Sequence, residues 1–212
     1  MSIMEIEGVR YSYDGRRNVL KGVSAKFEAG KMYAVLGPSG CGKTTLLSLL
    51  GGLDSPASGR ILYQGEDIAK TGLAEHRRSH VAFIFQSYNL IDYLTPMENV
   101  ALTSKLPPLP ILERLGFTPE EAKRNVLKLS GGQQQRVAIA RALASDAQVI
   151  LADEPTGNLD EDTAAGITGI LKECAHKSGK CVVIVTHSNE LAKSADAAMR
   201  LRKGELQISD GR

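Results

Sequence analysis

Tryptophan is absent from this 212-residue sequence, cysteine occurs only three times, and no apolar run is long. Uninterrupted apolar stretches, such as residues 81–85 and 181–185, fall far below the roughly 20 residues that span a bilayer. The three cysteines are an odd number without the CxxC spacing of a metal site, and the first residues lack the basic and apolar regions of a secretory signal. These absences argue against a membrane-spanning or secreted chain and predict a protein of the reducing cytoplasm.

Neither sign of charge dominates the sequence. The 26 basic residues nearly balance the 24 acidic ones, and the net charge of +2 is spread along the chain. A nucleic-acid-binding protein would usually carry a basic stripe, so no nucleic-acid partner is expected. With 42% hydrophobic and 24% charged residues, the composition is that of a globular protein, and the length predicts one domain over residues 1–212.

Short apolar runs alternate with helical patterns along the chain. A buried run feeds a glycine-rich loop and then a helix that ends at Gly51, and a helix at residues 161–176 separates the last two strands before the C-terminal region. This alternation predicts an α/β fold with a mostly parallel sheet. Strands are predicted at residues 3–9, 19–28, 31–36, 81–85, 148–152 and 181–185.

The stretch between Gln86 and Leu129 shows no strand pattern. Segments 98–102, 111–117 and 119–128 predict short helices, and a helical subdomain is expected over about residues 88–145. Segment 198–211 places Lys-Gly-Glu between two short alternating runs, which predicts a terminal hairpin.

The sequence GPSGCGKT at residues 37–44 fits the pattern GxxxxGK[ST] between a predicted buried strand and a helix start. Glycines let successive backbone N–H groups turn inward around an anion, and the helix N-terminus adds about half a positive charge. Lys43 is expected to bridge the terminal phosphates of a nucleotide, and Thr44 to hold Mg2+ through its hydroxyl. Cys41 fits the loop as a small residue, with sensitivity to thiol reagents as the alternative. The residues assigned to phosphate binding are Gly37, Pro38, Ser39, Gly40, Cys41, Gly42, Lys43, Thr44 and Thr45.

Two adjacent carboxylates, Asp153 and Glu154, end the apolar strand that begins near Gln148. Neighbouring residues of a strand alternate in direction, so the two can do different jobs. Asp153 is expected to hold Mg2+, directly or through water. Glu154 is expected to orient and deprotonate the attacking water at the γ-phosphate, although a capped strand end followed by a proline turn would look similar.

A second phosphate-binding helix start is predicted at Ser130, Gly131, Gly132 and Gln133, ahead of an amphipathic helix. Two glycines weaken a helix start by about 1 kcal/mol each relative to alanine, but they suit a backbone that an anion approaches closely. One chain with two such starts suggests a nucleotide shared between two chains.

These motifs, in this order, resemble the nucleotide-binding domains of ABC transporters, with the phosphate loop, the LSGGQ signature and the carboxylate strand of that family. The resemblance implies a P-loop NTPase with an N-terminal antiparallel β subdomain and an inserted α-helical subdomain. Here the stretch between Ser87 and Lys128 is shorter than usual, so a shortened helical subdomain is expected. ATP and Mg2+ are the implied cofactors, and the implied activity is ATP hydrolysis in a dimer, with a homodimer favoured.

The resemblance also assigns four roles outside the main motifs. Tyr13 is implied to stack on adenine, with Tyr11 as the alternative. Gln86 is implied to touch Mg2+ and the attacking water, and His187 to contact the γ-phosphate. Asp160 is implied to join the two sites across the dimer, and it also suits the N-cap of the next helix.

The remaining histidines and cysteines are predicted to be structural. His76 and His80 have the i,i+4 spacing of a metal pair, but without a third ligand they are expected to lie on a solvated helix face. Cys174 and Cys181 are expected to pack in a helix and a buried strand.

The strings LLGGLDSPASG, FQSYNLI and LADEPTGNLD resemble the branch that serves macrolide export, lipoprotein release and antimicrobial-peptide resistance. This implies a cytoplasmic motor on the inner face of the membrane, acting on a separate permease that exports or extracts a peptide, lipid-linked or drug-like substrate. A non-transporting ATPase that pulls on a membrane protein remains the alternative. A chromosome-organising ATPase would add coiled coils or zinc-binding cysteines, which the sequence lacks.

Overall fold

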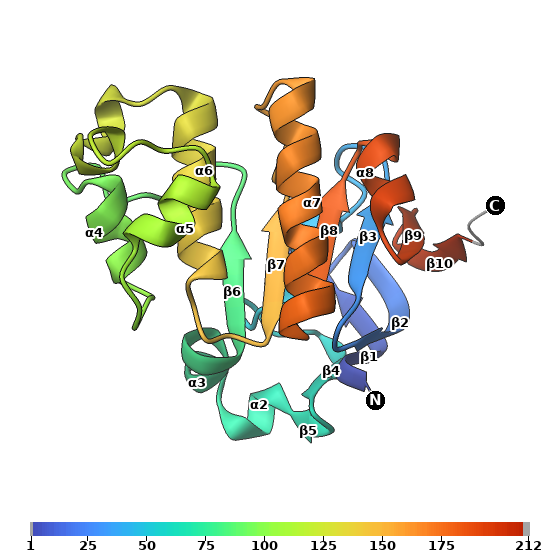
Figure 1. Cartoon of the computed structure of the whole chain (residues 1–212). Coiled ribbons are helices and arrows are strands. Elements are labelled where there is room, and N and C mark those ends of the chain that lie inside the picture. The colour runs from blue at the N-terminus through green and yellow to red at the C-terminus, as the bar shows by residue number, and fades with distance from the viewer. Residues whose placement is uncertain (1, 210–212) are drawn as a thin grey trace.

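The computed structural model, which describes residues 2–209, is built on a six-stranded sheet with the order β10-β9-β3-β8-β7-β6 (Figure 1). Neighbouring strands from β9 to β6 are parallel, and β10 pairs antiparallel with β9. The strands are β3 (Met32–Leu36), β6 (Val81–Ile84), β7 (Val149–Asp153), β8 (Cys181–Thr186), β9 (Ala197–Arg202) and β10 (Glu205–Ser209).

Strands β3, β7 and β8 are buried along their whole length, as their continuous apolar runs predict for a parallel sheet covered on both faces. Their registers align Leu36 with Thr186, and Asp153 with Val185. The carboxyl ends of the three strands therefore meet at one edge of the sheet. The segments that follow them start from this edge.

A second, antiparallel sheet has the order β2-β1-β4-β5 and confirms the N-terminal β subdomain. Two of its strands were not predicted, because β4 buries only Ile61 and Leu62 and β5 is two residues long. So little apolar periodicity gives no recognisable strand pattern. The strands are β1 (Ser2–Tyr11), β2 (Leu20–Glu28), β4 (Ser58–Tyr63) and β5 (Glu66–Asp67).

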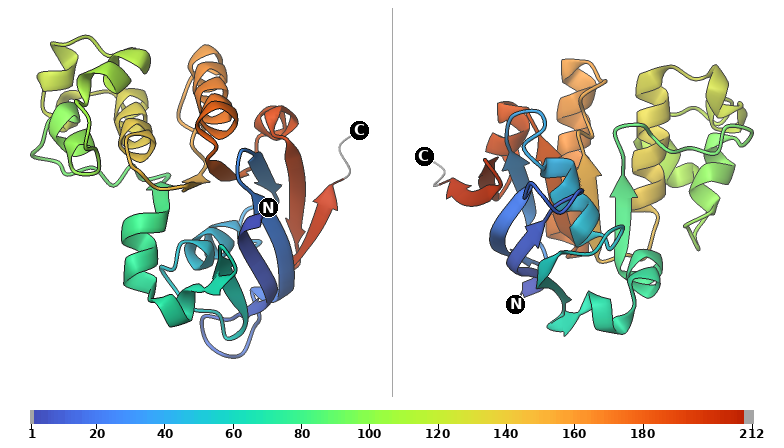
Figure 2. Two further views of the ribbon diagram at one scale, coloured as in Figure 1. Left: turned by 60° about the horizontal axis from the view of Figure 1, so that its bottom comes forward. Right: turned by 180° about the vertical axis from the view of Figure 1, so that it is seen from behind.

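Helices cover both faces of the central sheet. Helix α7 lies across one face in Figure 1, and the view from behind in Figure 2 shows α1 and the antiparallel sheet on the other. Alternate residues of β7 divide accordingly: Ile150 packs with the α6 and α7 side, and Leu151 with the α1 side. The helices around the core are α1 (Lys43–Leu50), α2 (Ile68–Thr71), α3 (Leu73–Glu75), a π-helical turn η1 (His76–His80), α7 (Glu161–Ser178) and α8 (Asn189–Ser194).

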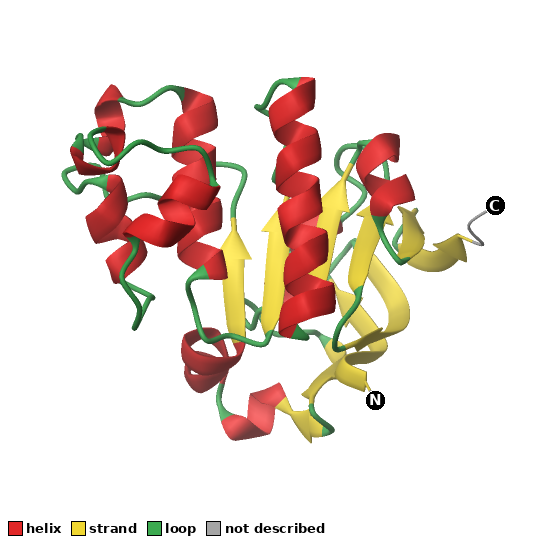
Figure 3. Cartoon of the chain, in the orientation of Figure 1, coloured by secondary structure: helices red, strands yellow, loops and turns green. Residues whose placement is uncertain are grey.

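The helical part stands to one side of the sheet, as the red ribbons of Figure 3 show. It contains α4 (Pro96–Ala101), α5 (Leu109–Arg114), the 3-10 turns η2 (Glu121–Lys123) and η3 (Val126–Lys128), and α6 (Gly131–Leu143).

The helix predicted for residues 119–128 is wrong, because the structure has only the turns η2 and η3 there. Asn125 is the reason. Its backbone is extended, its side-chain oxygen accepts a hydrogen bond from the Leu127 N–H at 2.9 Å, and its amide donates to Asp92 O at 3.0 Å. Asparagine competes in this way with helical hydrogen bonds.

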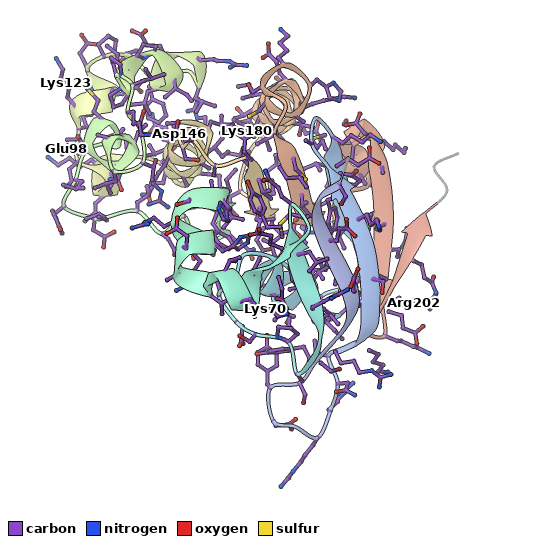
Figure 4. All side chains as sticks on the ribbon, turned by 90° about the horizontal axis from the view of Figure 1, so that it is seen from below. Lys70, Glu98, Lys123, Asp146, Lys180 and Arg202 are labelled. Carbon is purple, nitrogen blue, oxygen red and sulfur yellow. The ribbon has the colours of Figure 1, made fainter. Side chains whose placement is uncertain are left out.

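Polar contacts help to join the helical part to the core. Among them, Lys180, just before β8, donates to Ser145 O after α6 at 2.6 Å, and Arg114 of α5 pairs with Glu173 of α7. Figure 4 shows Lys180 and Asp146 on the same side of the molecule, seen from below. Burial lowers the pKa of Lys180, with Asp146 opposing that shift. Apolar side chains of both parts also pack in one buried cluster, so the junction combines polar and apolar contacts.

The structure also bears on the predictions for the cysteines, the terminal hairpin and membrane-spanning helices. Cys181 is buried in β8 and Cys174 half-buried in α7, which confirms their structural interpretation. The terminal hairpin is present as β9 and β10, with its last predicted residues, 210 and 211, outside the described part. Within residues 2–209, no helix is long and apolar enough to cross a membrane.

The prediction that His76 lies on a solvated helix face is wrong. Its side chain is fully buried, with Nε2 at 3.0 Å from Leu50 O and Nδ1 at 3.2 Å from His80 Nδ1. A carbonyl oxygen can only accept a hydrogen bond, so His76 Nε2 carries the proton and donates to Leu50 O. The other ring nitrogen, Nδ1, then accepts a hydrogen bond from His80 Nδ1. In the described residues, no group of three or more His, Cys, Asp and Glu side chains could hold a metal ion. The pair fastens η1 to the end of α1.

We expect His76 to make stability depend on pH. Burial lowers its pKa, with charge on His80 and Arg77 acting in the same direction and the Leu50 carbonyl opposing. Below about pH 6.5 the unfolded chain therefore binds more protons than the folded one, and the free energy of unfolding should fall as pH decreases. Urea unfolding at pH 7.5 and 5.5 should show a smaller decrease in His76→Gln than in the parent. An equal decrease in both would contradict this assignment.

Candidate nucleotide-binding site

A cavity of about 450 Å³ lies where the carboxyl ends of the parallel strands meet. Residues from the loop after β1, the loop before α1, and the ends of β6, β7 and β8 share it. This gathers most of the predicted site residues from five places in the sequence. The cavity is lined by Tyr13, Val19, Ser39, Gly40, Gly42, Lys43, Thr44, Thr45, Gln86, Asp153, Glu154 and His187.

The loop before α1 is fixed by its glycines. Gly42 caps the helix with a φ of 104°, a backbone conformation that side chains rarely adopt. At Gly37 an added Cβ would lie 2.5 Å from Leu201 O, so no larger residue fits. Lys43 is 9% exposed, and its Nζ donates to Gly37 O at 2.7 Å and Pro38 O at 3.2 Å. The cationic group is therefore held over the loop whose N–H groups would bind phosphate.

Two oxygen groups suited to a metal meet beside this loop. The Thr44 hydroxyl donates to Asp153 Oδ2 at 2.8 Å. Burial raises the pKa of the Asp153 carboxyl, and the Glu154 charge adds to that shift, whereas the Thr44 hydrogen bond and Lys43 oppose it. A bound cation would favour the charged carboxylate. A hydroxyl and a carboxylate at this separation fit Mg2+, which takes oxygen ligands.

Glu154 is held in a strained position at the end of β7. Its φ is 47°, in the left-handed region, and its N–H donates to Val185 O at 3.0 Å. The carboxylate accepts from Thr186 Oγ1 at 2.8 Å and lies 2.8 Å from His187 Nδ1. The Glu154 side chain is only 11% exposed. A carboxylate fixed on two sides in this way is suited to accept a proton from a positioned water.

Tyr13 and Tyr11, the two alternatives for the adenine contact, differ in their exposure and position. Tyr13 is 71% exposed and lines the cavity, with its hydroxyl 2.7 Å from Thr45 Oγ1. Tyr11 is 7% exposed and its hydroxyl donates to Asp54, which with burial raises its pKa to about 12. Only Tyr13 of this pair has a ring face available at the cavity.

The signature residues lie outside the cavity. Ser130 caps α6, because its hydroxyl oxygen accepts a hydrogen bond from the Gln133 N–H at 3.2 Å. The Gln133 side-chain oxygen in turn accepts one from the Ser130 N–H at 3.0 Å. Ser130 and Gly131 are exposed, and Gly132 packs beside Leu159 and Asn158. In Figure 1, α6 begins at the end of the molecule toward which β7 and β8 point. The chain thus presents a second helix start on the same side of the sheet, apart from the cavity.

The other predicted residues have clear places. Gln86 lines the cavity just after β6, and Asp160 caps α7 by accepting from the Thr163 N–H at 3.0 Å. Asp160 does not line the cavity, which fits the N-cap alternative. Cys41 is half-buried and also outside the cavity lining. Gly37 and Pro38 contribute their carbonyls, through Lys43.

Sequence reasoning missed two residues of this site. Thr186 holds the Glu154 carboxylate, and its place as the polar end of an apolar strand, next to His187, was a usable signal. Val19 lines the cavity as an apolar side chain before β2, and no chemical feature of its sequence context marks it.

Known proteins resemble this chain over most of its length. A family profile described as ABC transporter matches residues 20–157. The uncharacterized ABC transporter ATP-binding protein YclH of Bacillus subtilis (strain 168) is 42% identical over 99% of this chain and 98% of its own length. The macrolide export ATP-binding/permease protein MacB of Escherichia coli (strain K12) is 40% identical over 96% of this chain, which spans 34% of that protein.

Two solved structures of the ATP-binding cassette MJ0796 have nearly the same fold. Its dimeric structure, described as a bacterial ABC transporter cassette, superposes with a TM-score of 0.89 at 34% identity, covering 99% of this chain and all of the other. The dimeric post-hydrolysis state bound to ADP and Pi gives a TM-score of 0.87 at 33% identity, with the same coverage. The ATP-binding cassette fold and the family match together show that this chain belongs to the ABC transporter family, as one of its ATPases.

Proposed function

We propose that this chain is the motor subunit of a membrane exporter: two copies close around two MgATP and hydrolyse them to drive a separate permease. One observation carries the proposal. The phosphate loop, Asp153 and Glu154 share one cavity, whereas the exposed helix start at Ser130 lies outside it. A chain with two anion-binding helix starts, of which only one opens into this cavity, is suited to share each nucleotide with a second copy.

Within one copy, the residues divide the work. Lys43 and the loop N–H groups bind the phosphates, and the exposed ring of Tyr13 stacks on the base. Thr44 and Asp153 hold Mg2+ with Gln86 beside them, and the metal when bound neutralises charge on the phosphates.

The second group of residues acts on water. Thr186 and His187 fix the Glu154 carboxylate, which accepts a proton from the water that attacks the terminal phosphate. From the second copy, Ser130 and Gly131 contact the same phosphates, and Asp160 lies between the two sites.

A second hollow, a groove of about 650 Å³ that shares no lining residue with the nucleotide cavity, supplies the contact with the permease. Its lining includes the stacked rings of Phe83 and Phe85, whose centroids lie 4.9 Å apart, and the exposed Leu102. Arg77 and Arg78 also line the groove. The groove joins β6, which leads to Gln86, to the helical part. A permease segment with apolar and acidic side chains fits this surface.

The substrate class is proposed from relatives. MacB proteins, named for macrolide export, carry ATP-binding and permease parts in one chain, of which this chain matches about a third. The proposed substrate is therefore a peptide, lipid-linked or drug-like molecule, and the proposed location is the cytoplasmic face of the membrane.

We expect Glu154→Gln to trap an ATP-loaded dimer. Glutamine keeps the size of the side chain but cannot accept the proton, and loss of a general base costs about 100 to 10,000-fold in rate. Size exclusion should show a dimer with ATP and a monomer with ADP. Adding Ser130→Arg should remove the dimer while each monomer still binds ATP. A Glu154→Gln protein that stays monomeric in saturating ATP, or that hydrolyses near the parent rate, contradicts the proposal.

Tyr13→Ala should weaken ATP binding, because base stacking on an aromatic ring contributes roughly 1–3 kcal/mol. Tyr13→Phe keeps the ring and should bind close to the parent value in a titration with a fluorescent ATP analogue. Tyr11→Ala is the matched control: it removes a buried ring and the bond to Asp54, so it should lower stability without changing the ATP affinity of the folded protein. If Tyr11→Ala rather than Tyr13→Ala loses affinity, the adenine contact belongs to Tyr11 and the assignment of Tyr13 is wrong.

A further inference from the structure

The turn after Gln86 holds two consecutive non-glycine residues in the left-handed region. Tyr88 has a φ of 62° and Asn89 a φ of 50°. A bulky residue rarely adopts this conformation, so the surroundings must hold it there. Arg141 of α6 does so, because its Nη2 donates to Tyr88 O at 3.1 Å and its Nη1 to Asn89 O at 2.6 Å. A strained turn is thus clamped by one guanidinium.

The side chain of Tyr88 reaches two further segments. Its hydroxyl oxygen accepts a hydrogen bond from Asn158 Nδ2 at 3.1 Å, although the two residues are 70 positions apart in sequence. The same hydroxyl lies against Gly131, where an added Cβ would be 3.1 Å from it. One phenol therefore touches the loop after β7 and the exposed start of α6.

Each end of this chain of contacts reaches a functional surface. Arg141 lines the groove that we assign to the permease. Asn158 lies in the loop that begins at Glu154, where the Gly157 N–H donates to Glu154 O at 3.2 Å, and that ends at the cap Asp160. Tyr88 itself does not line the nucleotide cavity. It is placed to affect hydrolysis without touching the nucleotide.

We propose that Tyr88 is a positioning residue that connects the permease groove, through Arg141, to the loop carrying Glu154 and Asp160, through its hydrogen bond with Asn158. This inference rests on the proposed function for the role of the groove. A strained turn can relax when the clamp shifts, which would move the hydroxyl away from Asn158. The bond therefore sets how well Glu154 is aligned, and the rate of hydrolysis rather than ATP affinity should depend on it.

Steady-state ATP hydrolysis by the full chain tests the bond. Tyr88→Phe removes only the hydroxyl, and Asn158→Ala removes its partner. Each should lower kcat about three- to tenfold, the effect of losing one hydrogen bond, with KM for ATP and melting temperature close to the parent. The double variant should be no slower than the slower single variant, because both changes break the same contact. Tyr93→Phe is the control, since Tyr93 is an exposed tyrosine of the same segment, and its kcat should equal that of the parent.

Arg141→Lys tests the clamp. It keeps the charge but cannot donate to both carbonyls from a planar fork, so kcat should fall in the same direction. Adding Tyr88→Phe to it should lower kcat less than the same change does in the parent.

The outcomes are separable. An unchanged kcat in Tyr88→Phe, a rise in KM that accounts for the loss, or fully additive effects of Tyr88→Phe and Asn158→Ala would each overturn the inference. A parent chain without ATP turnover would instead contradict the proposed function itself.

Discussion

The parallel register of β3, β7 and β8 is the constraint on which the site depends. It places Leu36, Asp153 and Thr186 at one edge of the sheet, so that three segments far apart in sequence begin from neighbouring points. Thr44 then meets Asp153, and Thr186 meets Glu154, each at 2.8 Å. The left-handed backbone of Glu154 is a local cost of this arrangement, and such strain is typical of residues whose position matters for chemistry. A slip of one residue in the β7–β8 pairing would separate the carboxylates from their partners.

The same edge is the basis for proposing that a second copy of the chain completes each site. The cavity provides donors for the phosphates on one side, and the start of α6 provides donors that face solvent. A helix start with two glycines and free N–H groups attracts an anion through its dipole and its unpaired donors. In the described residues the cavity lining contains none of the signature residues, which supports the proposal that the two sets of donors that serve one nucleotide come from different chains. The Tyr88 hydroxyl bonds to Asn158 and lies against Gly131 at the start of α6, and these contacts are the basis of the positioning role proposed for it.

Much of this could be read from the sequence, because the strongest signals were local. A buried run followed by glycines and Lys43, and an apolar strand ending in two carboxylates, specify both element type and position. Features that depend on distant contacts were missed or misread. His76 looked solvated because its neighbours in sequence are charged, yet its side chain is buried and bonds to the Leu50 carbonyl, 26 positions away. Residues 119–128 have a helical pattern, but Asn125 caps a 3-10 turn there and interrupts the helix. Strand β4 has too few buried residues to show a strand period. The contact of Tyr88 with Asn158 spans 70 positions and has no sequence signature.

The central claim, that each nucleotide site is built from two chains, is tested most directly by mixing two inactive variants. Lys43→Ala disables the phosphate loop and Ser130→Arg disables the signature, so in any dimer that either protein could form alone, every site would have one defective half. In a mixed dimer, one site combines an intact phosphate loop with an intact signature. The account predicts that ATP hydrolysis appears on mixing, at a level above the sum of the separate proteins and rising with total concentration. A mixture that hydrolyses no faster than that sum would show that the site belongs to a single chain, and would contradict the account.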